Sequence, residues 1–246
     1  MEVALIHHSP DPIETLYAAY RTCYSSDTPI EIWGKIRRGV IPKEKMKKFI
    51  KDRLETGHNS PLEQVVFWFA VCGVSRSLSH QLVRHRIGIS FSQQSQRYVK
   101  LDCTGISYVP PDSWKEKNLD GEYRELMHQI VVAYDHALKA GILPEDARFV
   151  LPNATKTNFQ ICVNFAELLH IGDLRLCTRA QWEIRRMVSL MRAEVKKAIP
   201  DLGSYIQPKC GDKRMGFCDE ALNDWERCPI GKKRPHKSKC TPEVAP

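Results

Sequence analysis

The sequence lacks the motifs that identify the commonest nucleotide-binding and hydrolytic folds. It contains no G-x-G-x-x-G and no G-x-x-x-x-G-K-[ST], so neither a Rossmann nor a P-loop phosphate site is supported. It also contains no H-E-x-x-H zinc motif and no G-x-S-x-G, the usual nucleophile elbow of hydrolases. None of these activities is therefore indicated by a motif.

Long hydrophobic runs are missing as well. The longest, residues 65–72, is far shorter than the ~20 residues that span a bilayer. Residues 1–8 have neither a basic segment nor an adequate apolar one for a secretory signal. The nine cysteines are odd in number, and five stand singly in apolar or mixed surroundings, as small buried hydrophobes do: Cys23, Cys72, Cys103, Cys162 and Cys177. We expect a cytoplasmic protein that does not bind membranes.

Acidic residues are scarce around the most distinctive stretch of the chain. Only four lie from position 73 to position 120, whereas R-H-R at 84–86 is followed by S-Q-R-Y at 95–98. The planar fork of arginine matches phosphate, because it gives two parallel charge-assisted hydrogen bonds. Gln81 and Arg84 lie three apart on a predicted helix and can face one ligand. With a net charge of +8, these features indicate anionic partners, either nucleotides, other phosphates or nucleic acid.

The order of predicted elements favours an α+β fold with a mainly antiparallel sheet flanked by helices. We predict strands at 1–6, 61–73, 87–91 and 98–109. The predicted helices cover 12–24, 43–56, 76–84, 121–140, 158–170 and 180–198, with a short helical turn at 146–151. Composition changes at Gln207, so we expect one main domain, residues 1–206, and a basic, cysteine-rich C-terminal appendage, residues 207–246.

Several polar residues allow two interpretations. Ser95 could be a nucleophile, but no base and third group accompany it in the sequence, so a hydroxyl that donates to phosphate is favoured. Arg148 and Arg175 stand in apolar surroundings, where an arginine binds a ligand about as often as it neutralises a buried carboxylate. The candidate carboxylates are Glu145, Asp146 and Asp173.

Five ordered blocks of sequence resemble the flavin-dependent thymidylate synthases. The first is the R-H-R and S-x-R-Y pair described above, which is the hallmark of that family. The others are T-G-H-N-S-P-L-E at 56–63, A-R-F-V-L-P at 147–152, N-F-A-E-L-L-H at 164–170, and L-R at 174–175 before A-Q-W-E-I at 180–184. The resemblance covers roughly residues 1–200.

The resemblance implies an enzyme that converts dUMP to dTMP without an enzyme nucleophile. FAD and NADPH would supply the reducing power, methylenetetrahydrofolate would supply the carbon, and the active sites would be shared within a homotetramer. FAD would be bound by Ser60, Arg84, His85, Arg86, Gln93, Asn164, Phe165, Ala166 and His170, with His58 lining the pocket. The dUMP would be bound by Gln81, Leu82, Val83, Arg84, Gln93, Gln94, Ser95, Gln96, Arg97, Arg148 and Arg175. Arg175 would be the catalytic residue, stabilising negative charge on the uracil.

One departure from the family pattern concerns spacing. Eight residues separate Arg86 from Ser95, one more than usual. Gly88 is the natural place to absorb the extra residue in a bulge, because glycine accepts backbone angles that other residues avoid.

The cysteines of the appendage leave two interpretations open. Cys210, Cys218, Cys228 and Cys240 are separated by seven, nine and eleven residues, whereas zinc ligands commonly come in pairs two to four residues apart. We therefore favour free thiols on a mobile appendage over a structural metal, predict no metal, and expect the appendage to be dispensable for the chemistry.

The competing functional class is a nucleic-acid-binding protein with a phosphate-tracking surface. Against it, the arginines are dispersed over four segments, and we expect the basic residues not to be interleaved with exposed aromatic residues. We expect no nucleic acid partner. A flavoenzyme would purify yellow, and a nucleic-acid-binding protein would not.

Overall fold

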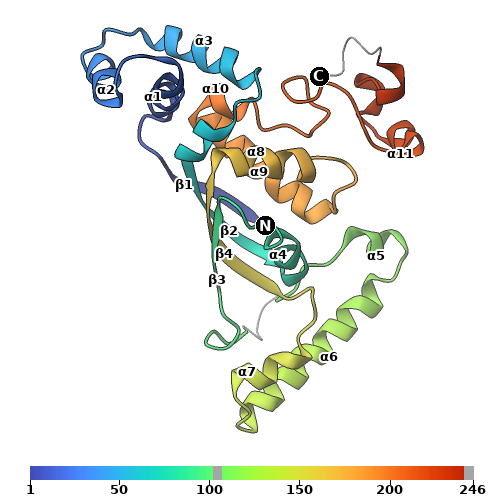
Figure 1. The fold of residues 1–246 in the computed structure, drawn as a ribbon. Helices are drawn as coiled ribbons and strands as arrows, with labels where there is room; N and C mark the ends of the chain where they lie inside the picture. The colour runs from blue at the N-terminus through green and yellow to red at the C-terminus, as the bar shows by residue number, and fades with distance from the viewer. Residues whose placement is uncertain (102–106, 241–246) are drawn as a thin grey trace. The chain divides into compact units, whose positions relative to one another are not determined.

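The computed structural model describes residues 1–101 and 107–240, except for the side chain of residue 232. It contains one four-stranded antiparallel sheet in the order β1-β2-β4-β3 (Figure 1). The strands are β1 (Glu2–His8), β2 (Val66–Ser75), β3 (Ile89–Gln93) and β4 (Lys156–Asn164). The predicted α+β fold is confirmed.

The two inner strands form because their apolar residues alternate. In β2, Phe67, Phe69 and Val71 are fully buried, and the residues between them are partly exposed. In β4, every second residue from Thr157 to Val163 is buried. This period of two places one row of side chains on a single face of the sheet.

The chain divides into two compact units, and all four strands of the sheet contribute residues to both. The first unit comprises residues 1–2, 70–84 and 91–160. Its helices are α4 (Arg76–Leu82), α5 (Asp112–Glu116), α6 (Asp120–Lys139) and α7 (Pro144–Ala147), with a 3₁₀ turn η2 (Arg148–Val150).

The second unit comprises residues 3–69, 85–90 and 161–246 as far as they are described. Its helices are α1 (Pro12–Tyr24), α2 (Pro29–Arg37), α3 (Lys43–Leu54), α8 (Phe165–Arg175), α9 (Trp182–Ala198), α10 (Pro200–Gly203) and α11 (Leu222–Arg227). Its 3₁₀ turns are η1 (Ser60–Gln64), η3 (Gly231–Lys233) and η4 (Lys237–Lys239). α9 buries an apolar stripe that includes Ile184, Met187, Val188, Met191 and Val195.

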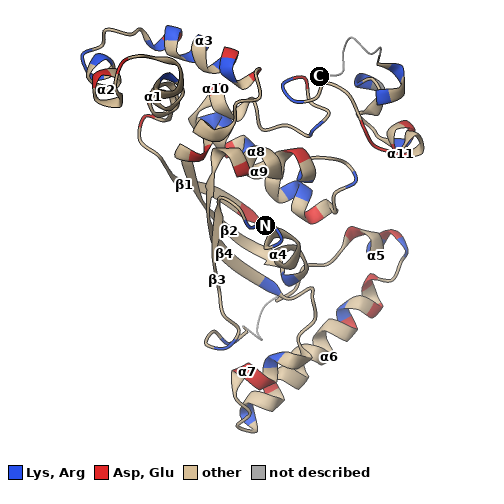
Figure 2. Cartoon of the chain, viewed as in Figure 1, with Lys and Arg blue, Asp and Glu red and all other residues tan. Residues whose placement is uncertain are grey.

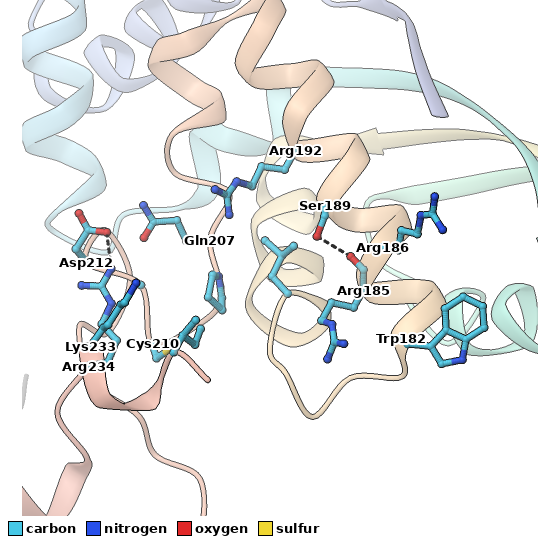
Figure 3. A pocket seen from close by; sticks show the side chains of 14 residues that line it. Trp182, Arg185, Arg186, Ser189, Arg192, Gln207, Cys210, Asp212, Lys233 and Arg234 are labelled. Atoms are coloured by element: carbon cyan, nitrogen blue, oxygen red, sulfur yellow. Dashed lines mark hydrogen bonds and ion pairs between the residues drawn. The ribbon is translucent and has the colours of Figure 1, made fainter. Parts of the chain in front are cut away.

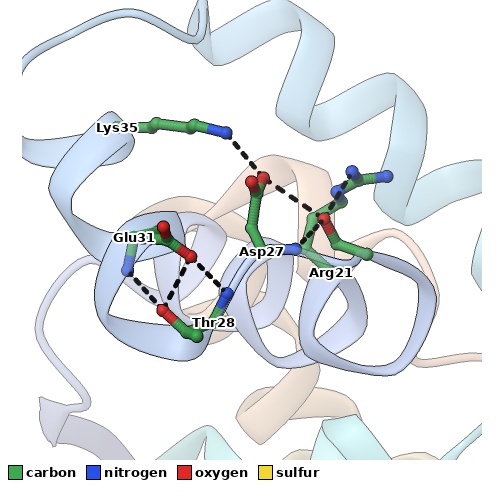
Figure 4. Close-up of polar contacts among 6 residues, drawn as sticks. Arg21, Asp27, Thr28, Glu31 and Lys35 are labelled. Atoms are coloured by element: carbon green, nitrogen blue, oxygen red, sulfur yellow. Dashed lines mark hydrogen bonds and ion pairs between the residues drawn. The ribbon is translucent and has the colours of Figure 1, made fainter.

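Helix α2 was not predicted, although its start is strongly encoded. Thr28 and Glu31 form a reciprocal capping box: the Glu31 amide donates to the Thr28 hydroxyl at 3.3 Å, and the Thr28 amide donates to a Glu31 carboxylate oxygen at 2.7 Å (Figure 4). An ion pair of 2.6 Å between Lys35 and Asp27 ties the helix to the preceding turn. The capping box satisfies amides that would otherwise lack partners at the helix start.

Two predicted elements were wrong, and residues 61–64 of the predicted strand at 61–73 belong to the 3₁₀ turn η1. The predicted helix at 158–170 is strand β4 up to Asn164 and helix α8 only from Phe165, because the alternation of buried residues in β4 outweighs the helical stripe. The predicted strand at 98–109 does not form over its described residues: Tyr108 makes only an isolated antiparallel bridge to Thr155. Residues 102–106 of that prediction lie outside the described residues. Within the described chain, no helix is both long and apolar enough to cross a membrane.

Candidate functional site

The first cluster of predicted site residues lies in the second unit, around His85. The His85 side chain is buried, and its Nδ1 lies 2.8 Å from Oε1 of Glu167 on α8. On the other side of the ring, Arg175 donates from Nε to His85 Nε2 at 3.1 Å. The ring of His170 meets that of His85 edge-on, with centroids 5.7 Å apart. We refer to these four residues as the His85 cluster.

The two hydrogen bonds of His85 select one tautomer. Arg175 Nε carries a hydrogen and can only donate, so His85 Nε2 must be the acceptor. The proton of the neutral ring then sits on Nδ1 and is donated to the Glu167 carboxylate. Burial lowers the pKa of His85, and the charge of Arg175 acts in the same direction, whereas Glu167 opposes the shift. The cluster therefore favours the neutral form of His85.

Arg175 ends α8 with a charge that no carboxylate neutralises within the described chain. The side chain is half-buried, and its burial lowers the pKa of the guanidinium. Asp173 is one of the carboxylates that could have paired with Arg175. It pairs with Arg214 instead, whose Nε and Nη2 lie 2.7 and 2.5 Å from its two carboxylate oxygens. An oriented guanidinium without a carboxylate partner is suited to an electron-rich ligand.

The His85 cluster also has the composition of a metal site. One ligand atom from each of His85, Glu167 and His170 lies within 4.8 Å of the others. However, both ring nitrogens of His85 are occupied, and the donor at Nε2 is a cationic guanidinium. A metal there would have to displace Arg175, so we interpret the cluster as a support for that arginine.

Asn164 joins the cluster to the R-H-R segment. It caps α8, its side-chain oxygen accepting from the Glu167 amide at 2.9 Å, and its own amide donates to the Gly88 carbonyl at 2.8 Å. Gly88 has a φ of +69°, and a Cβ atom there would lie 2.4 Å from the Asn164 side-chain nitrogen. Gly88 thus has a left-handed backbone conformation that glycine accepts, and its close approach to Asn164 leaves no room for a side chain.

The arginines of the R-H-R motif are exposed. Arg84 follows helix α4 and belongs to the first unit, and Arg86 belongs to the second unit. In the described part of the chain, neither has a carboxylate within ion-pairing distance. Guanidiniums left uncompensated in this way fit the pyrophosphate of a dinucleotide.

A third set of predicted residues lies at the turn before β2. His58 Nε2 lies 3.0 Å from the Ser60 hydroxyl, and its Nδ1 lies 2.8 Å from the hydroxyl of Tyr24. The rings of Tyr20 and Tyr24 both contact His58 edge-on. Tyr24 thus orients His58, and through it the Ser60 hydroxyl.

The S-Q-R-Y segment of the first unit borders a cavity of about 300 Å³. Ser95 and Gln96 line it, together with Lys156, Asn158 and Tyr134. Asn158 holds Gln94, another residue that lines the cavity, through two hydrogen bonds. Its side chain donates to Gln94 Oε1 at 2.8 Å, and its carbonyl accepts from the Gln94 amide at 3.0 Å. The cavity combines hydroxyl, amide and ammonium groups and has a size suited to a small ligand.

The remaining predicted nucleotide contacts are not gathered in that cavity. Arg97 forms an exposed ion pair with Glu145 at 3.1 Å, and Arg148 donates from Nε to the Glu145 carbonyl at 3.1 Å. Gln93 donates to the Thr157 hydroxyl at 3.1 Å. On α4, Leu82 is buried in the core and Gln81 is half-buried, and Val83 follows exposed. Phe165 is fully buried, so it can offer a ligand only its backbone.

Three residues that shape these clusters were not singled out from the sequence. Glu167 lies inside a quoted motif, but only the fold brings its carboxylate to His85. Tyr24 and Asn158 lie 34 and 64 residues from their partners His58 and Gln94. Sequence patterns report local periodicity and therefore carry no signal for such contacts.

On α6, basic residues do not form a continuous strip. Along α6, Lys and Arg are mixed with Asp and Glu (Figure 2), and two of them are paired, Arg124 with Asp120 at 3.2 Å and Lys139 with Asp135 at 2.6 Å. This pattern does not support the competing nucleic-acid-binding hypothesis.

Comparison with known proteins gives a consistent result. The family of thymidylate synthase complementing proteins (Thy1) matches residues 4–201. A flavin-dependent thymidylate synthase of Nitratidesulfovibrio vulgaris is 41% identical over 228 residues, which cover 89% of this chain and 91% of that protein. The corresponding enzyme of Clostridium tetani is 40% identical over 239 residues, with the same two coverages.

Solved structures show a similar fold. The flavin-dependent thymidylate synthase of Helicobacter pylori, complexed with FAD and dUMP, aligns with a TM-score of 0.65 at 22% identity, covering 84% of this chain and all of that one. The UMP/dUMP methylase PolB of Streptomyces cacaoi, bound to 5-Br dUMP, aligns with a TM-score of 0.68 at 20% identity, covering 83% and 93%.

Proposed function

Because the chain belongs to the thymidylate synthase complementing protein family, whose relatives at up to 41% identity are flavin-dependent thymidylate synthases, we propose that it methylates dUMP to dTMP. FAD and NADPH would provide the reducing equivalents, and methylenetetrahydrofolate would provide the carbon. The observation that carries the proposal is the half-buried guanidinium of Arg175, which His85 orients and which has no carboxylate partner in the described chain.

Arg175 would act on the uracil ring. Negative charge develops on the pyrimidine oxygens and nitrogen as C5 attacks the one-carbon unit, and a fixed cation stabilises that charge more than it stabilises the ground state. The Nε–H of Arg175 is occupied by His85, so the two terminal nitrogens remain to face the ligand. The Glu167–His85 pair holds the guanidinium in place, which means that no side chain has to reorganise during the reaction.

The residues near the start of α8 fit a flavin dinucleotide. Asn164 and the backbone at Phe165 and Ala166 lie at the helix N-terminus, where amide groups and the helix dipole favour an anion. The exposed guanidiniums of Arg84 and Arg86 are free of ion pairs in the described chain and would neutralise the pyrophosphate. Once bound and reduced by NADPH, the flavin would supply the hydride that completes the methyl group.

The polar cavity of the first unit would hold the phosphate and sugar of dUMP. The Ser95 hydroxyl and the Gln96 side chain line it, and Lys156 adds a positive charge. Arg97 and Arg148 each contact Glu145 and would exchange that carboxylate or carbonyl for the stronger negative charge of a phosphate. We also propose a homotetramer in the cytoplasm, because closed symmetry is the usual form of soluble homo-oligomers.

The test is dTMP formation from dUMP by the purified protein with FAD, NADPH and methylenetetrahydrofolate. Omission of each component in turn identifies which is required. We expect yellow protein, NADPH oxidation that dUMP accelerates, and a tetramer by light scattering. Protein that stays colourless after FAD addition and gel filtration would contradict the proposal.

A further inference from the structure

The appendage has a definite structure without an apolar core of its own. Among the described side chains of residues 207–240, no hydrophobic one is buried, and the buried residues are only Gly211, Gly231 and His236. Its longest helix, α11, has six residues. Segments of this kind usually depend on a cross-link, either disulfides or a metal, because hydrophobic burial cannot offset the entropy of ordering the chain.

Contacts between neighbouring residues draw four cysteine-bearing segments together. Cys228 Sγ lies 3.2 Å from the hydroxyl of Thr178, the residue that follows Cys177. Lys209, which precedes Cys210, donates its amide to the Asp173 carbonyl of α8 at 3.2 Å.

Four ion pairs add to these hydrogen bonds. The ammonium of Lys209 lies 2.6 Å from Asp219 and 3.1 Å from Glu220, the two residues after Cys218. Arg179 pairs with Glu220 at 2.9 Å and with Asp224 of α11 at 2.6 Å. The segments at 177, 210, 218 and 228 are therefore tied to one another at positions next to their cysteines.

The thiols of this group also influence one another electrostatically. Burial raises the pKa of the Cys210 thiol, and the thiols of Cys218, Cys177 and Cys228 raise it further. Burial also raises the pKa of Cys218, and Cys177 contributes to that shift. None of the four is in a disulfide. A divalent metal that binds neighbouring thiols converts them to thiolates.

Positive side chains lie near Cys210. Cys210 lies on the wall of a cavity of about 560 Å³, together with Arg185, Arg192, Lys233 and Arg234 (Figure 3). A divalent ion with four thiolates carries a net charge of about −2, since each ligand must be deprotonated. The surrounding guanidinium and ammonium groups would balance that charge.

We propose that Cys177, Cys210, Cys218 and Cys228 bind a structural zinc ion that fastens the appendage to the end of α8. Among the described residues, only His85, Glu167 and His170 already bring three ligand atoms within 4.8 Å of one another. The metal would thus draw the four sulfurs inward, to Zn–S distances of about 2.3 Å in a tetrahedron. Cys177 belongs to the main domain, and the other three ligands belong to the appendage. Because the ligands come from separate segments that the fold brings together, they need not occur as pairs two to four residues apart in the sequence.

Cys240 provides a matched control. It belongs to the same appendage, but its thiol donates to the His236 carbonyl at 3.6 Å and does not contribute to the pKa shift of Cys210 or Cys218. The test is the zinc content of the purified full-length chain by elemental mass spectrometry. We expect one zinc per chain in the parent protein and in Cys240→Ser, and at least a tenfold loss in Cys210→Ser and Cys218→Ser.

A second measurement does not depend on how the variants fold. Titration of the parent protein with a mercurial thiol reagent should release zinc to a chromogenic chelator. Cobalt substitution should give the intense thiolate-to-cobalt band in the near ultraviolet. Zinc at background level, two disulfides in the purified protein, or iron with inorganic sulfide would each overturn the proposal.

Discussion

Arg175 offers two terminal nitrogens to a ligand because its Nε is already committed to His85. Replacement by alanine should lower dTMP formation about a hundred- to a thousandfold, which is roughly the 2.7–4 kcal/mol lost when one preorganised electrostatic donor is removed. Arg175→Lys keeps the charge but loses the planar fork, so it should be impaired as well. The measurement is dTMP turnover with flavin content determined in parallel. Both variants should bind FAD, and parent-like turnover in Arg175→Ala would exclude a catalytic role.

Glu167 is a positioning residue in this arrangement, since it acts on Arg175 only through His85. Glu167→Gln keeps the shape but no longer offers a charged acceptor to the Nδ1–H of His85. Loss of a buried hydrogen bond to a charged group is worth about 1.5–3 kcal/mol, which corresponds to roughly a 10- to 150-fold fall in kcat. KM for dUMP should change much less.

The exposed Glu122→Gln on α6 serves as the control for the loss of one negative charge. A merely structural role for Glu167 would lower the melting temperature and leave the kcat of the folded fraction unchanged.

His85 makes the enzyme sensitive to acid. Its pKa is lowered by burial in the folded state, so below the ordinary value of about 6.5 the unfolded chain binds more protons than the folded one. The free energy of unfolding should therefore fall as pH drops below about 6.5. Protonation of His85 at Nε2 would also remove the acceptor of the Arg175 Nε–H hydrogen bond. The other titratable groups that face the His85 ring are His170 and Glu167.

The pH effect is measured as dTMP turnover and chemical denaturation between pH 8 and pH 5. The control is His128→Gln, which removes an exposed histidine of α6 and should leave the profile unchanged. Turnover that is constant over this range would contradict the assignment of neutral His85.

At the scale of elements, Gly88 connects the R-H-R segment to the start of α8. Gly88→Ala places a methyl group 2.4 Å from the Asn164 side-chain nitrogen, so the helix cap has to move. Gly39→Ala is a matched control, because Gly39 has a φ of +66° but no atom within 4 Å of the place that its methyl group would take. Each should lose about 1–2 kcal/mol of stability from backbone strain. Only Gly88→Ala should also weaken FAD binding, which flavin fluorescence titration measures.

The contrast between β4 and α8 explains which elements the sequence could predict. Helices with clear end signals, such as the one capped by Ser75, were predicted close to their observed bounds. The prediction at 158–170 fails because Phe159, Ile161 and Val163 belong to a strand while Leu168 and Leu169 belong to a helix, and no glycine or proline separates the two. The cap of that helix, Asn164, is recognisable only when the strand before it is known.

At the scale of the whole molecule, local motifs predicted which residues matter but not how they are connected. The R-H-R and L-R motifs point to His85 and Arg175 separately, and the 90 residues between them are bridged only in the folded chain. The same holds for Cys177 and the three cysteines of the appendage. Contacts at such separations depend on topology, which hydrophobic periodicity does not encode.

The appendage supplies the last prediction. Truncation after Ile206 removes Arg214 and leaves Asp173 of α8 without its bidentate partner. Asp173 and Arg175 are two residues apart on a helix and therefore face different directions, so the freed carboxylate does not reach the guanidinium of Arg175. Truncation should lower the free energy of unfolding by about 1–3 kcal/mol, or about 2–4 °C in melting temperature per kcal/mol for a chain of this size, while FAD binding and dTMP turnover persist.

Arg214→Gln isolates the ion pair from the rest of the appendage and should reproduce part of the loss of stability. Calorimetry and flavin content on the parent, the truncated chain and Arg214→Gln separate the two contributions. Loss of FAD or of the tetramer on truncation, with both retained in Arg214→Gln, would show that the appendage supports the active site by contacts other than Arg214–Asp173. Truncation also removes three of the four proposed zinc ligands, whereas Arg214→Gln keeps all four. If the parent chain and Arg214→Gln both hold zinc, the tetrathiolate site accounts for the stability that Arg214→Gln leaves unexplained, because a structural metal contributes its binding free energy to folding.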